Sequence, residues 1–264
     1  MLPLFSLCCA LLPWLVSQVG PVIAETAPVL APRILGDFPH DQGLFTQGLF
    51  LYRGRLYEST GLRGQSRLLI TELASGEKLA VRWLAPRLFA EGADLCGDEV
   101  VQLTWTSGLA LRYDPVTLGK IGDFRYQGQG WGIACHGQRM VTSDGSARLT
   151  FRDPNTFEPL RTVTAVDQGQ DVRHLNELEW VDDVLLANVW KSHRIAVIDP
   201  DTGVVRQWLD LTEAVQRSGQ TGEEFVLNGI AWDADQRRLY VTGKGWSHLY
   251  WIDWPGRQAR LGSD

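Results

Sequence analysis

The chain has 264 residues, of which 44% are apolar and 21% are charged, and its formal net charge is −6. This balance is typical of a globular protein and excludes a disordered or fibrous chain. An acidic chain without a basic run is poorly suited to nucleic acid, so we expect no nucleic-acid partner. Eleven Trp residues are many for this length, and we expect some of them to line a site.

The first 24 residues differ from the rest of the chain. They contain no Lys, Arg, Asp or Glu and end in the sequence VIA before Glu25. The segment predicts a secretory signal peptide, residues 1–24, and a secreted or periplasmic protein without stable membrane contact. An uncleaved membrane anchor is the alternative, although the Pro and Gly residues of the segment would make a poor membrane helix.

One strand-rich pattern recurs five times in the remaining chain, at intervals of about 40 to 52 residues. Each copy reads as a strand, a short turn, a second strand, a polar corner and a third strand that ends in an acidic turn. Three of these turns contain Asp-Pro, in "YDPVTLG", "RDPNTFE" and "IDPDTGV", and we expect each to lead into an outer strand. The copies begin at Gln47, Glu91, Trp131, Asn176 and Asn228.

Repeats of this period, each with several short strands, are typical of a β-propeller. We therefore predict an all-β fold, a single five-bladed β-propeller over residues 25–264. Because little chain follows the fifth copy, residues 32–40 should supply its outer strand and close the ring. A helical insertion is expected within residues 209–225. A β-sandwich is the alternative, but it would not explain five copies in phase.

Two cysteines lie beyond the signal segment, Cys96 and Cys135, at similar points of consecutive copies. In an oxidising compartment such a pair suggests a disulfide. Two buried free thiols are the alternative.

Equivalent positions in the five copies carry unlike side chains. In a propeller the first strand of each blade lines the central channel, so the five starting residues should gather at one end of it. Unlike side chains at repeated positions favour an asymmetric pocket there, whereas a merely polar, wet channel mouth is the alternative. A second equivalent set is expected at the corner after the second strand: Glu58, Trp105, Asp144, Trp190 and Lys244.

Familiar catalytic motifs are missing from the sequence. It has no nucleophile elbow, no Walker loop and no Rossmann glycine pattern. Its histidines lack zinc-ligand spacing, and we expect no catalytic metal. We expect each of the five to be a surface or turn residue: His40, His136, His174, His193 and His248.

Eight motifs point to one family: "FPHDQGLFTQGLFLYRGRLYESTG", "QLTW", "GQGWGI", "TSDGS", "LNELEW", "ANVW", "LNGIAWD" and "VTGKGW". They closely resemble, over residues 33–252, the plant and bacterial type glutaminyl-peptide cyclotransferases. The resemblance implies a five-bladed propeller that converts the N-terminal glutamine of a peptide or protein to pyroglutamate and releases ammonia. It also implies that no cofactor is required and that there is no catalytic zinc, although family members can carry a structural calcium ion. We expect a monomer, because a closed ring needs no partner strand.

The resemblance assigns roles position by position. The catalytic acid of the family matches Glu91, which we expect to act as a proton shuttle. Lys244 and an indole N–H are expected to stabilise an oxyanion, while Asn176 and Gln47 hold the substrate. The aromatic pocket residues match Phe45, Phe89, Trp105, Trp131 and Trp190.

Several points stay open from the sequence. Glu58 is a competing acid, unless it only forms a hydrogen bond at the end of a strand. Lys191 and Arg63 depart from the family pattern and are expected to add positive charge near the pocket. A binding-only propeller would keep the aromatic residues but would not need an acid. A calcium-dependent, lactonase-like propeller would instead use four oxygen ligands: Glu91, Asn176, Asn228 and Asp144.

Overall fold

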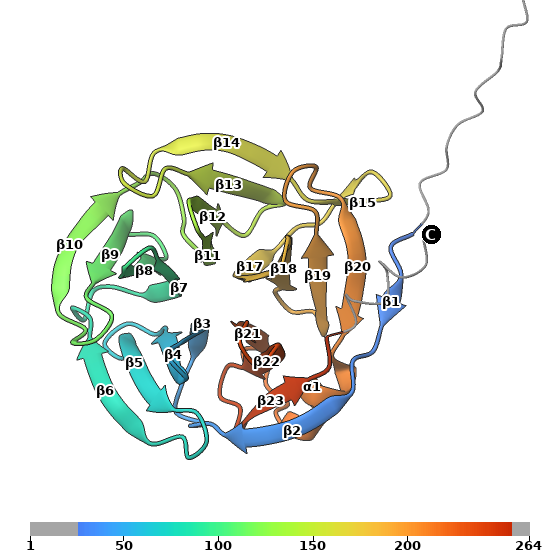
Figure 1. The fold of residues 1–264 in the computed structure, drawn as a ribbon, viewed down its shortest axis with the longest axis horizontal. Coiled ribbons are helices and arrows are strands. Elements are labelled where there is room, and N and C mark those ends of the chain that lie inside the picture. Colours follow the sequence, from blue (N-terminus) through green and yellow to red (C-terminus); the bar gives the residue numbers. More distant parts are fainter. Residues whose placement is uncertain (1–25, 255–264) are drawn as a thin grey trace, which may run out of the picture.

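The computed structural model describes residues 26–254, which form five antiparallel blades around a central channel (Figure 1). The prediction of a five-bladed propeller is confirmed, and the predicted signal peptide lies outside the described residues. No helix in the described part of the chain is long and apolar enough to cross a membrane.

Each blade runs outward from an inner strand at the channel. The first is β3 (Thr46–Tyr52), β4 (Arg55–Thr60), β5 (Arg67–Glu72) and β6 (Lys78–Trp83). The second is β7 (Ala90–Cys96), β8 (Glu99–Thr104), β9 (Leu109–Tyr113) and β10 (Lys120–Arg125). The third is β11 (Ile133–His136), β12 (Arg139–Ser143), β13 (Arg148–Arg152) and β14 (Pro159–Thr164). The fourth is β17 (Leu175–Val181), β18 (Val184–Val189), β19 (Arg194–Ile198) and β20 (Val205–Asp210).

The fifth blade contains strands from both ends of the described chain. It consists of β21 (Leu227–Asp233), β22 (Arg238–Gly243), β23 (His248–Ile252) and β2 (Ile34–Pro39). Strand β2 pairs antiparallel with β23, in the register Phe38 opposite Leu249, so residues 32–40 close the ring as predicted.

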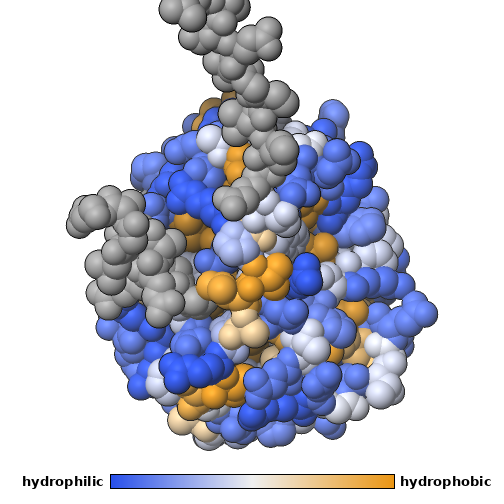
Figure 2. All heavy atoms as spheres, turned by 90° about the vertical axis from the view of Figure 1, so that its right-hand side faces the viewer, coloured by the Kyte–Doolittle hydropathy of each residue, from blue (hydrophilic) through white to orange (hydrophobic). Residues whose placement is uncertain are grey.

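Four smaller elements of the described chain lie around the five blades. Strand β1 (Val29–Leu30) pairs in parallel with β20, and a short hairpin joins β15 (Val166–Asp167) to β16 (Gln170–Asp171). Helix α1 (Thr212–Ser218) lies within the predicted insertion. Figure 2 looks at the ring from the side near β1 and β20, where apolar surface forms separate patches among hydrophilic side chains.

The Asp-Pro turns form as predicted and connect the third strand of a blade to its outer strand. In the second blade, Oδ1 of Asp114 accepts hydrogen bonds from the backbone N–H of Val116 at 3.1 Å and of Thr117 at 2.8 Å. Asp153 and Asp199 accept the corresponding pairs of bonds in the third and fourth blades. The short acidic side chain thus fixes the turn by replacing a backbone acceptor.

The core of the molecule lies between neighbouring blades. One large cluster joins the fourth and fifth blades, with Leu186, Ile230 and Trp246 fully buried within it. Between the second and third blades the contact is also covalent, because Cys96 and Cys135 form a disulfide between β7 and β11. Of the two alternatives for these cysteines, the disulfide is therefore confirmed.

A buried ion pair anchors the segment that closes the ring. The side chain of His40, directly after β2, is 3% exposed, and that of Glu58 is 1% exposed. The imidazole donates through Nδ1 to the carbonyl of Trp246 at 2.7 Å and through Nε2 to Oε2 of Glu58 at 3.1 Å. Burial by itself lowers the pKa of His40, but the charge and hydrogen bond of Glu58, the hydrogen bond to Trp246 and the charge of Asp41 together outweigh it, so the net shift is upward.

Two predictions about these residues are wrong. His40 is not a surface or turn residue, although the other four histidines are at least partly exposed. Glu58 does not occupy the corner after the second strand, because its side chain lies within β4 and also accepts from Thr46 Oγ1 at 2.7 Å. The corner residue is Gly61, whose N–H donates to the carbonyl of Phe45 just as the N–H of Trp105 donates to that of Phe89.

We predict that His40→Ala lowers the free energy of unfolding by about 3–5 kcal/mol, because it leaves the Glu58 carboxylate buried without its cation. Lys78→Ala is the matched control, since it removes the exposed ion pair with Asp41 and should cost less than about 1 kcal/mol. Urea unfolding followed by circular dichroism gives both values. Equal costs for the two variants would show that the buried pair does not anchor the ring.

Candidate active site

All nine residues predicted for the site line one cavity. Its volume is about 650 Å³, and it opens at the end of the channel where the inner strands begin. The predicted residues that line it are Phe45, Gln47, Phe89, Glu91, Trp105, Trp131, Asn176, Trp190 and Lys244. Five further residues complete the lining: Leu62, Gln129, Lys191, Glu223 and Glu224. The expected asymmetric pocket therefore exists.

Aromatic rings form the walls of the cavity. Phe89 meets Phe45 edge-on at 6.3 Å and Trp105 at 5.6 Å between ring centroids. Across the cavity, Trp131 and Trp190 meet edge-on at 5.8 Å. Gly61 leaves room for the Phe89 ring in this wall, because a Cβ at position 61 would lie only 2.5 Å from that ring. These walls offer an apolar surface that excludes water from a small ligand.

Gln129 holds two of the tryptophans in place, and sequence reasoning missed it. Its Oε1 accepts hydrogen bonds from Nε1 of Trp105 at 2.7 Å and from Nε1 of Trp131 at 2.9 Å. Those two indole N–H groups are thus engaged, whereas Nε1 of Trp190 has no hydrogen-bond partner among residues 26–254. The motif "GQGWGI" contains Gln129, but nothing in the motif reveals that its side chain spans two blades.

The floor of the cavity carries two ionisable groups without a direct partner. Within the described part of the chain, the Glu91 carboxylate and the Lys244 ammonium form no hydrogen bond or ion pair, and Lys244 Nζ lies 4.6 Å from the Phe45 ring centroid. Burial raises the pKa of Glu91 well above its usual range, partly opposed by Lys244. Burial also lowers the pKa of Lys244 to about 8, partly opposed by Glu91.

Two amides on the floor present opposite polarities. Asn228 Nδ2 donates to Oε1 of Gln47 at 3.2 Å and to the carbonyl of Thr46 at 2.9 Å. Because Oε1 of Gln47 accepts the bond from Asn228, the N–H groups on Nε2 of Gln47 remain free to donate into the cavity. Asn176 Oδ1 is buried and has no hydrogen-bond partner in the described structure, so it is a free acceptor. The floor can therefore donate to a ligand carbonyl and accept from a ligand N–H.

A buried polar chain behind the floor positions Glu91. The hydroxyl of Ser59 donates to the Glu91 backbone carbonyl. Gln102 Nε2 donates to Ser59 Oγ at 2.8 Å, and the Tyr113 hydroxyl donates to Gln102 Oε1 at 3.2 Å. Because Ser59 and Gln102 are fully buried, this chain is rigid and fixes the backbone from which the carboxylate projects.

An ion pair at the mouth changes the charge expected there. Lys191 Nζ lies 2.8 Å from Glu223 Oε2 and 5.1 Å from the Trp190 ring centroid. The positive charge expected from Lys191 is therefore compensated. Arg63 does not line the cavity and instead donates to the carbonyl of Arg87 at 3.4 Å.

The proposed calcium ligands of a lactonase-like site do not converge. Neither Asp144 nor Asn228 lines the cavity, and Asp144 binds Arg148 at 2.5 Å. Among residues 26–254, no group of three or more His, Cys, Asp or Glu side chains could hold a metal ion. The buried channel acids Asp94 and Glu177 each accept a backbone N–H bond at both carboxylate oxygens.

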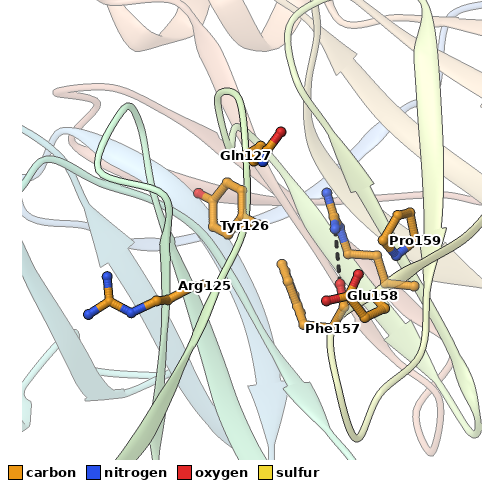
Figure 3. A pocket seen from close by; sticks show the side chains of 7 residues that line it. Arg125, Tyr126, Gln127, Phe157, Glu158 and Pro159 are labelled. Carbon is orange, nitrogen blue, oxygen red and sulfur yellow. Dashed lines mark hydrogen bonds between the residues drawn. The ribbon is translucent and has the colours of Figure 1, made fainter.

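A second hollow of about 530 Å³ lies between the second and third blades (Figure 3). Its side chains include Tyr126, Gln127 and Arg152, and Arg152 donates to the carbonyl of Phe157 at 3.0 Å. None of the predicted site residues lines it. Seven of the ten residues singled out from the repeats line the channel cavity, and the other three, Glu58, Asp144 and Asn228, line neither hollow.

A family model described as glutamine cyclotransferase matches residues 6–254. This chain belongs to the glutamine cyclotransferase family. A glutaminyl-peptide cyclotransferase of Arabidopsis thaliana is 38% identical over 237 residues, which cover 88% of this chain and 73% of the relative. The crystal structure of the glutaminyl cyclase of Myxococcus xanthus matches with a TM-score of 0.82 and 34% identity, covering 86% of this chain and 97% of that one.

The resemblance seen in the sequence is therefore confirmed, and the cyclotransferase is an enzyme of the acyltransferase class. In this enzyme the repeats and the family motifs point to the same cavity. Its unpartnered acid, free amide groups and aromatic walls are the features on which a reaction can be built.

Proposed function

We propose that this enzyme converts the N-terminal glutamine of peptides and proteins to pyroglutamate, with release of ammonia. The observation that carries the proposal is the buried Glu91 carboxylate, which has no partner among residues 26–254 and lies on the floor of a cavity with aromatic walls. Membership of the glutamine cyclotransferase family supports the same reaction.

The reaction closes a five-membered ring within one residue. The α-amine nitrogen attacks the side-chain amide carbon, a C–N bond forms, and the bond to the amide nitrogen breaks. One proton leaves the amine and one reaches the departing nitrogen, so that ammonia is released. The amine must be neutral to attack, and its pKa in a free peptide is about 7.7–8.0.

The aromatic walls supply orientation. Because both reacting groups belong to one residue, holding its side chain folded back on its own amine removes much of the entropic barrier. Phe89 and Trp105 on one side and Trp131 and Trp190 on the other confine the side chain. They also keep water from the reacting atoms.

Glu91 is the proton shuttle. Its carboxylate takes a proton from the attacking amine and, once protonated, passes a proton to the departing ammonia. The raised pKa of Glu91, caused by burial, brings this group closer to neutral pH, where both steps are feasible.

Donors around the floor stabilise the tetrahedral intermediate. Lys244, the indole N–H of Trp190 and Gln47 Nε2 all line the cavity and donate to the amide oxygen as it becomes the oxyanion. Asn176 Oδ1 accepts from the substrate amine, which satisfies its otherwise unpartnered oxygen. A binding-only propeller would have no use for an unpartnered acid at this depth, because burying it is costly.

We predict that Glu91→Gln lowers kcat/KM for Gln-Ala by about 10²–10⁴-fold while the fold is retained, because the shuttle is lost. Treatment of the wild type with EDTA should leave turnover unchanged, since the proposed mechanism uses no metal. Ammonia release measures the effect of the substitution and of EDTA. The control variant is Glu77→Gln, because Glu77 is an exposed acid on the outer part of the first blade. Loss of activity with EDTA would refute metal independence, and full activity of Glu91→Gln would refute the shuttle.

The pH profile of kcat/KM should be bell-shaped. Activity rises with pH as Glu91 and the substrate amine lose protons, and falls above about pH 8 as Lys244 loses its charge. Lys244→Arg should move the falling side to higher pH, whatever its effect on the maximal rate, because Arg stays charged. A falling side that does not move in this variant would exclude Lys244 as the cation.

We also propose that the enzyme is exported and acts as a monomer. The charge-free first 24 residues and the disulfide between Cys96 and Cys135 support export, and the closed ring needs no partner strand. Native mass spectrometry of the exported protein should give the mass of one chain of residues 25–264 with two hydrogens fewer. A retained N-terminal segment or a dimer mass would contradict the proposal.

A further inference from the structure

The depth of the cavity dictates which part of a substrate meets which residues. The four polar groups of the floor are almost fully buried, between 2% and 5% exposed, and they are Gln47, Glu91, Asn176 and Lys244. If the N-terminal glutamine reacts there, as the proposed function requires, the rest of the peptide must leave through the mouth. The second residue of the substrate therefore passes the mouth residues Leu62, Gln129, Lys191, Glu223 and Glu224.

A fixed loop brings two acids to this mouth. Residues 219–226 follow helix α1 and lead into β21. At one end of the loop, Gln220 Nε2 donates to the carbonyl of Gly245 at 2.7 Å. At the other end, the carbonyl of Phe225 accepts from Nε1 of Trp246 at 3.1 Å. Between these two anchors, Glu223 and Glu224 face the cavity.

The charges at the mouth do not cancel. Lys191 neutralises Glu223 through their ion pair. Glu224 is exposed and has no cationic partner in the described part of the chain. Lys244 is 4% exposed and belongs to the floor. A substrate side chain at the mouth thus meets one net negative charge.

We infer that Glu224 favours substrates with a basic side chain directly after the N-terminal glutamine and disfavours those with an acidic one. The inference rests on the proposed function and names the peptides that this enzyme takes best. Since the contact is solvent-exposed, its strength should depend on salt.

Three amidated peptides, Gln-Lys-Ala, Gln-Ala-Ala and Gln-Glu-Ala, test the inference, because amidation removes the C-terminal charge. At low salt, we expect kcat/KM for the Lys peptide to exceed that for the Glu peptide about five- to tenfold. In about 0.5 M NaCl the ratio should fall below about twofold. A ratio near one at low salt, or a ratio that salt does not change, would overturn the inference.

Three variants sharpen the test. Glu224→Gln should bring the ratio close to one, and Lys191→Ala should enlarge it, because Glu223 then loses its cation. Glu213→Gln is the matched control, since Glu213 lies on α1, pairs with Arg217 at 2.6 Å and does not line the cavity. An unchanged ratio in Glu224→Gln would refute the role of this residue. Absence of ammonia from all three peptides would refute the proposed function itself, whereas equal turnover of all three would refute only the charge preference.

Discussion

Closure of the ring is the constraint on which the site depends. The fifth blade is complete only when β2 pairs with β23, and the segment is then anchored by His40 against Glu58 and Trp246. A closed ring keeps five inner strands pointing the same way around one channel, so that their first residues meet at one end. The cavity is the space between those residues.

The acids of the molecule differ in how their charge is compensated. Glu58 is compensated by His40, and Asp144 and Glu223 are paired with Arg148 and Lys191. Among residues 26–254, the Glu91 carboxylate forms neither an ion pair nor a hydrogen bond, whereas the buried acids Asp94 and Glu177 accept backbone N–H bonds; Lys244 influences Glu91 without a direct contact. Leaving a carboxylate buried and unpaired costs stability, and proteins retain that cost where the group is used. The same burial moves the pKa values of Glu91 and Lys244 towards neutral pH, where a proton transfer is useful.

The site is asymmetric although the fold is repeated. At the corner after the second strand, one blade has Gly61, where the Phe89 ring occupies the space of a side chain, and two others have Trp105 and Trp190. The fourth blade and the loop after α1 then place Lys191, Glu223 and Glu224 over one side of the mouth. Five blades with equivalent backbones but unlike side chains can thus hold a small chiral substrate in a single orientation.

Much of the fold and of the candidate site was determined by the sequence alone. The period of the repeats, the Asp-Pro turns and the lack of an outer strand after the last copy were enough to predict the propeller and its closure, because each is a local pattern with a local cause. The register of the copies also placed seven of the nine pocket residues, since equivalent positions in a ring share one end of the channel, and the family resemblance added Phe45 and Phe89. Other features were decided only by the tertiary structure. The choice between a disulfide and free thiols depended on β7 lying beside β11, and Gln129 joins two indoles in neighbouring blades. Glu58 was placed wrongly for a similar reason. Gly61 has no side chain to mark the corner in the sequence, and His40, the partner of Glu58, follows a different strand, β2. Likewise Lys191 meets Glu223 across 32 residues of chain. Contacts of this kind depend on where separate strands and loops lie in space, which no local pattern records.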